Sequence, residues 1–498
     1  MKTQIKILSL LLAVLMLVSV FVACDDSKEE DTQGTLAAES DSGTEAESEV
    51  VTEAMPSVEQ KSYNTEFYLS ILDDVNFPRY YWVEESENDA MSESVFARQQ
   101  KLLEWLGVEL VGVGIGLNYN NYIEPFKTAV KNKDGSIDTL LSHVSTGVAG
   151  IVSEGYLRTF NDMPGINLNS GCWNLEFMDS LAISDNYYLG FNDFNILYTH
   201  VFAFNKQMMD QYSDAIETPV YDMVRNYTWT IDNMIKVVNL VYIDATADGK
   251  TTDDTFGLTG RQWVPWVGFL HACNINLVDL DESGTYKIAL MNDLNKDKTA
   301  SLVEKLTELS KSNSSYLDYA TTSITSVPFD TGRVLMFLES TYGLVSFLDY
   351  DINFGVLPYP MWDEAQKDTS GYRHLQWGGY ICIPTYLGDE TMVGETLEVL
   401  SFFSDAVKVA YYEKMLGKQV ADVPDDSEML SIIWDTVCCE FAQTYCQTLG
   451  GTQLLYLMAT VTEANTSTNV ASTVAGLERS ANTSITKFMK KVEKATGK

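Results

Sequence analysis

The sequence predicts an α/β protein whose folded part is made of two lobes. Apolar, strand-like segments alternate with amphipathic, helix-like segments after the N-terminal region, and this order is typical of a mostly parallel sheet with helices on both faces. More than 430 residues follow the first sixty. That length exceeds what one hydrophobic core usually supports, so we expect two lobes.

The alternation is clearest in the first part of the folded region. Gly107 is expected to end the first helix, and the loops after Leu72, Val113 and Val144 are candidate ligand sites, because ligands bind at the carboxyl ends of parallel strands. Strands are predicted over 66–72, 108–113 and 138–144, and helices over 92–106 and 122–131.

A second group of elements begins near residue 197. Thr230 or Asp232 is expected to cap a helix there. Strands or short elements are predicted over 197–204, 332–337, 353–358 and 381–383. Helices are predicted over 206–212, 219–225, 231–240, 299–311, 395–403, 407–416, 427–449 and 469–495.

The N-terminus predicts an exported and anchored protein. Lys2 and Lys6 precede an apolar run, 7–22, that fits a signal-peptide core rather than a spanning helix. Ala23-Cys24 at its end resembles a bacterial lipobox, in which cleavage after residue 23 leaves a cysteine that carries a diacylglyceryl group. We therefore expect a lipid anchor at Cys24 and a place on the outer face of the cytoplasmic membrane. An ordinary cleaved signal, or an uncleaved anchor, is the alternative.

Residues 24–60 predict a disordered acidic linker. They are rich in Glu, Asp, Ser and Thr and lack aromatic residues, so they cannot bury enough apolar surface to fold. The whole chain has a formal charge of −37, which argues against a nucleic-acid partner because phosphate binding needs a basic face.

No metal or cofactor site is expected. The six cysteines beyond Cys24 have no CxxC or His-paired spacing, and scattered buried thiols are the favoured interpretation, with a disulfide left open. Residues 244–249 resemble the start of a calcium loop. However, the twelfth position, where a bidentate carboxylate belongs, is Thr255, so a capped turn is favoured and calcium is left open.

Several segments together resemble one known family. They are Phe204-Asn205-Lys206, Tyr227-Thr228-Trp229-Thr230, Phe256-Gly257-Leu258, Gly332-Arg333-Val334-Leu335-Met336 and Asn353-Phe354-Gly355-Val356-Leu357-Pro358-Tyr359-Pro360. In this order they resemble the extracellular solute-binding lipoproteins of sugar-type ABC importers (family 1, maltose-binding-like). The resemblance covers residues 63–449.

The resemblance implies a type II periplasmic-binding-protein-like fold, with a hinge of crossing strands and the ligand in a cleft. We expect crossings near 198–204, 354–358 and residue 404. The implied division is 61–200 and 356–404 in the first lobe, and 201–355 and 405–498 in the second. The resemblance further implies a monomer that captures a small molecule, a sugar or oligosaccharide, when its lobes close. It would deliver this ligand to ABC permease subunits, and no covalent bond would be made or broken.

A sugar site needs aromatic platforms for the flat faces of the ring. Trp377 is the leading candidate, because it precedes Gly378-Gly379 on a loop expected to face the cleft. Packing in the core is the alternative for every tryptophan and tyrosine. The other aromatic candidates are Tyr342, Trp173 and Trp266, the last with Arg261 nearby.

A sugar site also needs groups that form hydrogen bonds with hydroxyls. Asp73 and Asp74 follow the first predicted strand, and His143 ends the third, so all three are candidates by position. A solvated turn is the alternative for the two acids, and an ordinary satisfied polar residue is the alternative for the histidine.

Three other functions compete with sugar import. An exported glycan-active enzyme stays open, because the sequence does not show which of the 70 acidic residues meet in the folded chain. The chain has only four histidines and no HExxH or GxSxG motif. A ligand-presenting auxiliary of a membrane sensor and a peptide-binding relative are the others. Sequence alone separates none of these from sugar import.

Overall fold

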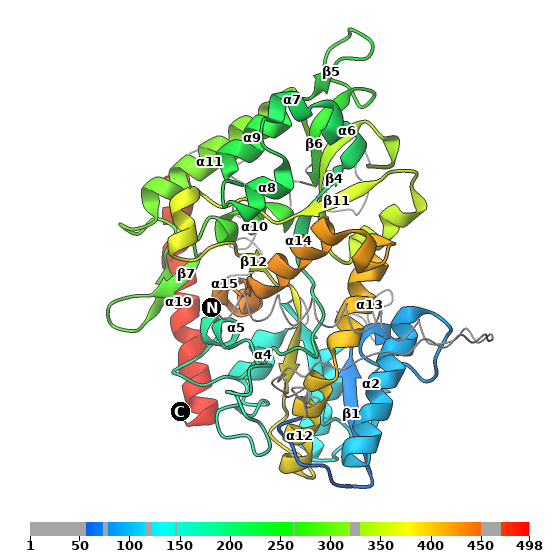
Figure 1. The fold of residues 1–498 in the computed structure, drawn as a ribbon. Helices are drawn as coiled ribbons and strands as arrows, with labels where there is room; N and C mark the ends of the chain where they lie inside the picture. The colour runs from blue at the N-terminus through cyan, green and yellow to red at the C-terminus, as the bar shows by residue number, and fades with distance from the viewer. Residues whose placement is uncertain are drawn as a thin grey trace, which may run out of the picture. The chain divides into compact units, whose positions relative to one another are not determined.

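The computed structural model describes residues 56–72, 78–114, 121–144, 147–261, 264–318, 329–449 and 470–497. The chain separates into two units, Met1–Met55 and Pro56–Lys498, and the fold given below is that of the second unit. The predictions for Cys24, Asp73 and Asp74 fall outside the described residues. Two larger sheets organise the second unit (Figure 1).

The first sheet has the strand order β13-β3-β1-β2. Strand β1 pairs in parallel with both β2 and β3, while β13 lies antiparallel on β3. The mostly parallel sheet predicted for this part of the chain is therefore confirmed. The strands are β1 (Thr65–Ile71), β2 (Val108–Val113), β3 (Thr139–His143) and β13 (Gly378–Cys382), and the helices that connect the first three are α2 (Ala90–Leu106) and α3 (Ile123–Asn132).

Helix α2 shows how local sequence sets the element ends. The Asp89 carboxylate accepts from the backbone N–H groups of Met91 and Ser92, which satisfies donors that have no partner inside the helix. Gly107 ends the helix with φ 61°, as predicted, and its N–H donates to the Leu103 carbonyl at 2.8 Å.

The second sheet has the order β11-β4-β10-β6-β5, with β9 paired to β6. Strand β10 lies parallel to β6 and antiparallel to β4. Its strands are β4 (His200–Asn205), β5 (Tyr242–Ile243), β6 (Thr255–Arg261), β9 (Ser315–Asp318), β10 (Val334–Ser340) and β11 (Phe354–Leu357). The helices between them are α6 (Lys206–Gln211), α7 (Ser213–Ile216), α8 (Val220–Arg225), α9 (Ile231–Asn239), α10 (Val264–Ala272) and α11 (Lys296–Lys311).

Strand β11 belongs to this second sheet, where it pairs with β4. The predicted crossing between the lobes at 354–358 coincides with β11. After β11, the chain next enters the first sheet at β13. Helices α12 (Glu390–Phe402) and α13 (Asp405–Leu416) then pack on α2, and α14 (Pro424–Asp435) packs on β11. The lobe boundaries at residues 200, 355 and 404 stay predictions.

Smaller elements complete the unit. Thr230, rather than Asp232, caps α9, because its hydroxyl accepts from the Asn233 N–H. The remaining elements are α4 (Val148–Ser153), α5 (Leu175–Ser180), the hairpin β7 (Val278–Leu280) and β8 (Tyr286–Ile288), β12 (His374–Leu375), β14 (Val437–Cys438), α15 (Phe441–Thr444), α16 (Cys446–Leu449), α19 (Val470–Thr496) and the 3-10 turns Pro78–Tyr80, Phe329–Thr331, Gly343–Asp349, Glu364–Asp368 and Val420–Asp422.

The single helix predicted over 427–449 is wrong. Helix α14 ends at Asp435, and the two residues of β14 then pair in parallel with β12. The Thr436 hydroxyl, which follows α14, donates back to the Ile432 carbonyl at 2.7 Å. Glu440 then starts a new helix by accepting from the Gln443 N–H at 2.7 Å. A distant strand therefore interrupts a segment whose local pattern is helical.

The acidic loop at 244–254 is a capped turn, as the sequence favoured. The Asp254 carboxylate accepts from the N–H groups of Ala245 and Thr251, each at 2.9 Å, and that of Asp244 accepts from Gly249 at 3.1 Å. No group of three His, Cys, Asp or Glu residues that could hold a metal ion occurs within the described ranges.

The six cysteines from Cys172 to Cys446 form no disulfide, and all but Cys172 are buried. This agrees with the interpretation as scattered thiols. In the described part of the chain, no helix is both long and apolar enough to cross a membrane.

Candidate functional site

Two chain segments lie next to the ends of the larger sheets, and they are bonded to each other. Residues 196–200 lead into β4 of the second sheet, and residues 375–378 lead from β12, which pairs with β14, into β13 of the first sheet. The Trp377 N–H donates to the Tyr198 carbonyl at 2.9 Å. The Trp377 carbonyl accepts from Val144, just past the end of β3, at 3.4 Å. We call residues 196–200 and 375–378 the hinge segments.

The carboxamide of Gln376 holds the hinge segments in register. Its oxygen accepts from the Tyr198 N–H at 2.9 Å, and its nitrogen donates to the carbonyls of Ile196 at 3.0 Å and Gly378 at 2.8 Å. The side chain is fully buried. A buried amide is costly unless it is hydrogen-bonded, so these contacts favour one arrangement of the backbone.

Hydroxyl groups add further links at the same place. The Thr199 hydroxyl donates to the Leu375 carbonyl at 2.7 Å, and the Tyr411 hydroxyl from α13 donates to the Leu197 carbonyl at 2.8 Å. Thr341, at the end of β10, donates from its hydroxyl to the same Leu197 carbonyl at 2.9 Å. Elements of both sheets therefore converge on the hinge segments.

Three of the residues predicted to bind ligand gather here. The Tyr198 ring lies 5.6 Å from the His143 ring and 6.2 Å from the Tyr342 ring, between centroids. The Trp377 ring stands edge-on to His200 at 5.6 Å. These five residues, His143, Tyr198, His200, Tyr342 and Trp377, form what we call the hinge aromatic cluster.

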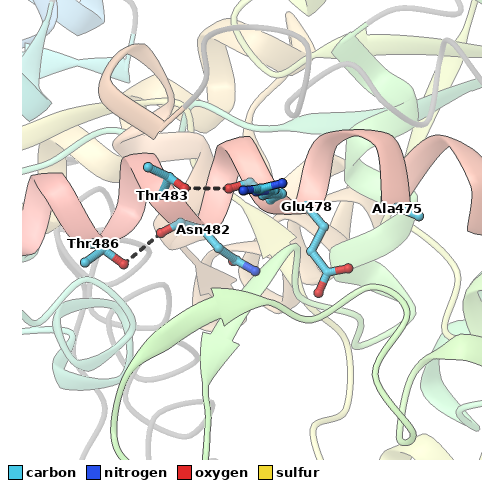
Figure 2. A pocket seen from close by; sticks show the side chains of 6 residues that line it. Ala475, Glu478, Asn482, Thr483 and Thr486 are labelled. Carbon is cyan, nitrogen blue, oxygen red and sulfur yellow. Dashed lines mark hydrogen bonds between the residues drawn. The ribbon is translucent and has the colours of Figure 1, made fainter.

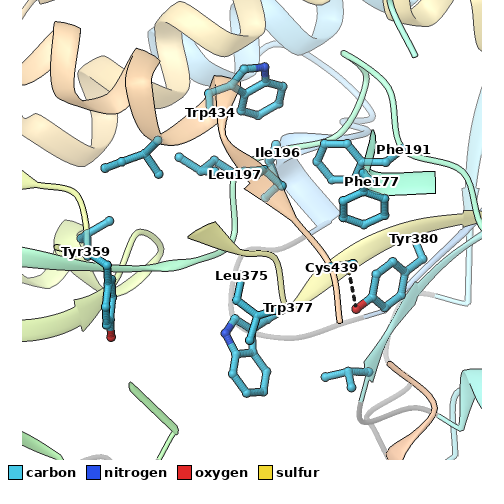
Figure 3. Packing of buried hydrophobic residues seen from close by; sticks show 14 of the residues in the cluster. Phe177, Phe191, Ile196, Leu197, Tyr359, Leu375, Trp377, Tyr380, Trp434 and Cys439 are labelled. Carbon is cyan, nitrogen blue, oxygen red and sulfur yellow. Dashed lines mark hydrogen bonds between the residues drawn. The ribbon is translucent and has the colours of Figure 1, made fainter. Parts of the chain in front are cut away.

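Exposure divides the cluster. Trp377 is 6% exposed and His143 is 7% exposed, whereas Tyr198 and Tyr342 are partly exposed. Figure 3 shows Trp377 beside Leu375 among the buried hydrophobic residues. In this conformation a ligand would reach the two tyrosines first. The predicted roles of Trp377, Tyr342 and His143 in binding stay predictions.

Burial keeps two histidines of this region, His143 and His374, neutral. It lowers the pKa of His143 to about 3, and that of His374 to about 3. His374 Nε2 accepts from the Tyr359 N–H at 3.1 Å, and its Nδ1 lies 2.8 Å from the Thr436 hydroxyl. Neutral imidazoles can exchange hydrogen bonds with hydroxyl groups, and they bring no charge for an ionic ligand.

The other predicted ligand residues lie elsewhere. Trp266 is fully buried in α10 and packs on Phe269, with ring centroids 5.2 Å apart. Trp173 is 5% exposed, and its indole N–H donates to the Glu398 carboxylate at 2.6 Å. Arg261 ends β6 opposite Asp318, and its side chain is outside the description. Both tryptophans are therefore buried in this conformation, and their predicted roles in binding, like that of Arg261, stay predictions.

Sequence reasoning did not select Tyr198 or Gln376. Both lie in segments that it had marked, because Tyr198 begins the predicted first crossing and Gln376 precedes Trp377. The available signal was Gln376 itself, a polar residue with a long side chain directly before Trp377-Gly378-Gly379. Two of the partners of Gln376, Tyr198 and Ile196, are about 180 residues away along the chain, so no local pattern could identify them.

A hollow of about 470 Å³ lies away from the hinge, on α19 (Figure 2). None of the predicted ligand residues lines it. Its lining side chains come from successive turns of one helix, namely Ala475, Glu478, Arg479, Asn482, Thr483 and Thr486. A sugar site between two lobes would draw on both, so we place the candidate site at the hinge aromatic cluster instead.

Comparison with known proteins is informative at the level of structure. No family model matches the chain, and no curated protein matches it. A cyclo/maltodextrin-binding protein complexed with maltotetraose matches at a TM-score of 0.52 and 12% identity, over 86% of this chain and 98% of its own. An ABC substrate-binding protein from Listeria monocytogenes in complex with cycloalternan matches at 0.50 and 12%, over 87% and 99%.

The chain has the maltose-binding-like type II fold. This confirms the predicted fold class. In this fold, the hinge segments lie in the connections between the two larger sheets. The hinge aromatic cluster lies at the carboxyl end of β3, one of the strand ends where the sequence predicted a site.

Replacing Gln376 tests how far the stability of the fold depends on the contacts between the hinge segments. Gln376→Leu keeps the approximate volume but leaves the Tyr198 N–H and two carbonyls without this partner. Because each buried orphan group costs about 1–3 kcal/mol, we expect the free energy of unfolding to fall by about 3 kcal/mol or more. Urea unfolding measures this change. Gln207→Leu, on an exposed site of α6, should change it by less than about 0.5 kcal/mol, and an equal effect of the two variants would contradict the assigned role.

The buried His374 predicts acid sensitivity. Its folded-state pKa of about 3 lies below the ordinary histidine value of 6.5, so its contribution to stability is present above about pH 6.5 and is lost as the pH falls toward 3. His374→Gln can still accept from Tyr359 but cannot titrate. We expect the fall in unfolding free energy between pH 6 and pH 4 to be smaller in this variant, by up to about 1.4 kcal/mol per pH unit. Urea unfolding at both pH values gives the slopes, and identical slopes would contradict the prediction.

Proposed function

We propose that this chain is an extracellular binding protein that captures a sugar or oligosaccharide and delivers it to an ABC importer. The observation that carries the proposal is the hinge aromatic cluster, which brings rings from the end of β3, the end of β10 and both hinge segments to one place in a maltose-binding-like fold. The two similar structures reported above hold maltotetraose and cycloalternan.

Aromatic rings and neutral hydrogen-bonding groups suit a carbohydrate. The faces of Tyr198 and Tyr342 can stack on the C–H face of a sugar ring, and their hydroxyls can exchange hydrogen bonds with its hydroxyls. The neutral His143 beside Tyr198 adds a further polar group. An unmodified polyol therefore fits this chemistry better than an ionic ligand.

Closure of the lobes is the proposed mechanism. A ligand that touches both sheets gains its full contacts only when they approach, so its binding energy shifts an equilibrium between open and closed states. The permease subunits would recognise the closed form. Hydrogen bonds made by Gln376 and Thr341 would keep the hinge segments paired while more distant parts of the lobes move.

The proposal includes an anchor at Cys24. A diacylglyceryl group there would hold the chain on the outer face of the cytoplasmic membrane, since two acyl chains anchor stably where one does not. Residues 24–60 would serve as an extended acidic tether. The protein would act as a monomer and without a cofactor.

A carbohydrate panel tests the ligand class. We expect a maltodextrin-type or other oligosaccharide to raise the Tm of the purified protein, with a gain in stability that follows RT ln(1 + [L]/Kd). Tyr342→Ala should weaken that binding by about tenfold or more, because it removes a partly exposed ring of the cluster. The control is Tyr227→Ala, since Tyr227 is 42% exposed and stacks on Tyr372 outside the cluster.

The same panel separates the competing functions. Stabilisation by peptides and by no sugar would overturn the carbohydrate proposal in favour of a peptide-binding relative. Release of shorter sugars from the panel, followed by chromatography, would instead reveal a glycan-active enzyme. Uptake of the bound sugar by cells with and without the protein separates transport from sensing.

Metabolic labelling tests the anchor. Cells given a radiolabelled fatty acid should incorporate the label into the wild-type protein. After fractionation, the labelled protein should be found in the membrane fraction. Cys24→Ser should remove the label and release the protein from that fraction, because the thioether to the lipid can no longer form. Membrane retention of an unlabelled Cys24→Ser chain would mean that residues 7–22 stay attached as an uncleaved anchor.

A further inference from the structure

The last helix of the fold carries an exposed basic face. Lys487, Lys490, Lys491 and Lys494 of α19 are all exposed. Their spacing of i, i+3, i+4 and i+7 puts them on one side of the helix. We call these four residues the α19 lysine face.

The opposite side of α19 is anchored in the core. Ile485, Phe488 and Val492 are at most 1% exposed, and the Phe488 ring lies 4.9 Å from that of Tyr445 and 6.2 Å from that of Phe441. The helix is therefore held firmly, and its lysine face is presented to the outside as a fixed array.

No acidic side chain of the described residues pairs with this face. The ion pairs found in the described ranges include none of the four lysines. Other exposed lysines do find acids, as Lys101 does with Glu104 and Lys296 with Asp293. Lys133, Lys236, Lys311 and Lys367 are likewise exposed and absent from these ion pairs. What distinguishes the α19 lysine face is that its four lysines lie together on one side of one helix, in a chain with 70 acidic and 33 basic residues.

Helix stability does not explain the arrangement. Lysines near a helix C-terminus interact favourably with the helix dipole, but that benefit does not depend on which side they occupy. Like charges at i, i+3 and i, i+4 repel one another. Placing all four on one face therefore works against the isolated helix, and an external anionic surface would offset that repulsion.

We propose that the α19 lysine face docks on anionic phospholipid headgroups of the membrane to which the chain is tethered. This inference rests on the anchoring part of the proposed function, which keeps the folded unit near a bilayer. The net charge of −37 repels an anionic surface, so a fixed cationic face would select the orientation in which the folded unit approaches it. Docking would hold α19 toward the membrane.

Vesicle flotation tests the docking with the anchor removed. The full chain from residue 24, carrying Cys24→Ala, is mixed with vesicles of phosphatidylcholine alone or with 30% phosphatidylglycerol (about this fraction is enough to give a negative surface potential). We expect binding only to the phosphatidylglycerol vesicles, weakening as salt is raised. The variant K487E/K490E/K491E/K494E should bind about tenfold more weakly or worse.

A matched variant controls for net charge. K133E/K236E/K311E/K367E changes four exposed lysines outside α19 and alters the charge of the chain by the same amount. It should retain binding, and thermal unfolding should show that both variants are folded.

Equal loss of binding in the two variants, or no dependence on phosphatidylglycerol, would overturn the proposal. So would binding to soluble polyphosphate without binding to vesicles, which would assign the face to a phosphate polymer. Sugar binding is measured separately, so these outcomes leave the test of the proposed function intact.

Discussion

The need to satisfy buried polar groups at the hinge segments is the constraint on which the rest of the structure depends. One carboxamide, that of Gln376, serves backbone groups of both segments, and it does so where the side chain is fully buried. A slip of either segment would leave N–H and carbonyl groups without partners, which costs more than most packing changes. The relation between the two sheets, and the position of every ring near the hinge, follows from this register.

The hinge register also explains why residues from distant parts of the sequence form one cluster. Tyr198 meets His143 on one side and Tyr342 on the other because its own backbone is bonded to Trp377. The cluster joins the end of β3 in the first sheet to the end of β10 in the second. Under the proposed function, a ligand held there would be sensitive to the separation of the sheets.

Local chemistry made most of the element ends predictable. Gly107 ends α2 and Thr230 begins α9 because glycine tolerates positive φ and a threonine hydroxyl accepts from an N–H within its own turn. The prediction of one helix over 427–449 was wrong because that segment is shaped by a distant contact. Its interruption at β14 depends on pairing with β12, some 60 residues earlier, which no window of local sequence contains.

The sequence by itself determined the α/β class and most of the order of the elements, because these depend on periodicity, capping and turn chemistry over short spans. Tertiary structure decided which aromatic residues are accessible. Trp266, Trp173 and Trp377 are as suitable in residue type as Tyr342, but all three are buried, whereas Tyr342 is partly exposed. Burial depends on contacts across the whole fold, and those contacts form only when segments far apart in the chain meet.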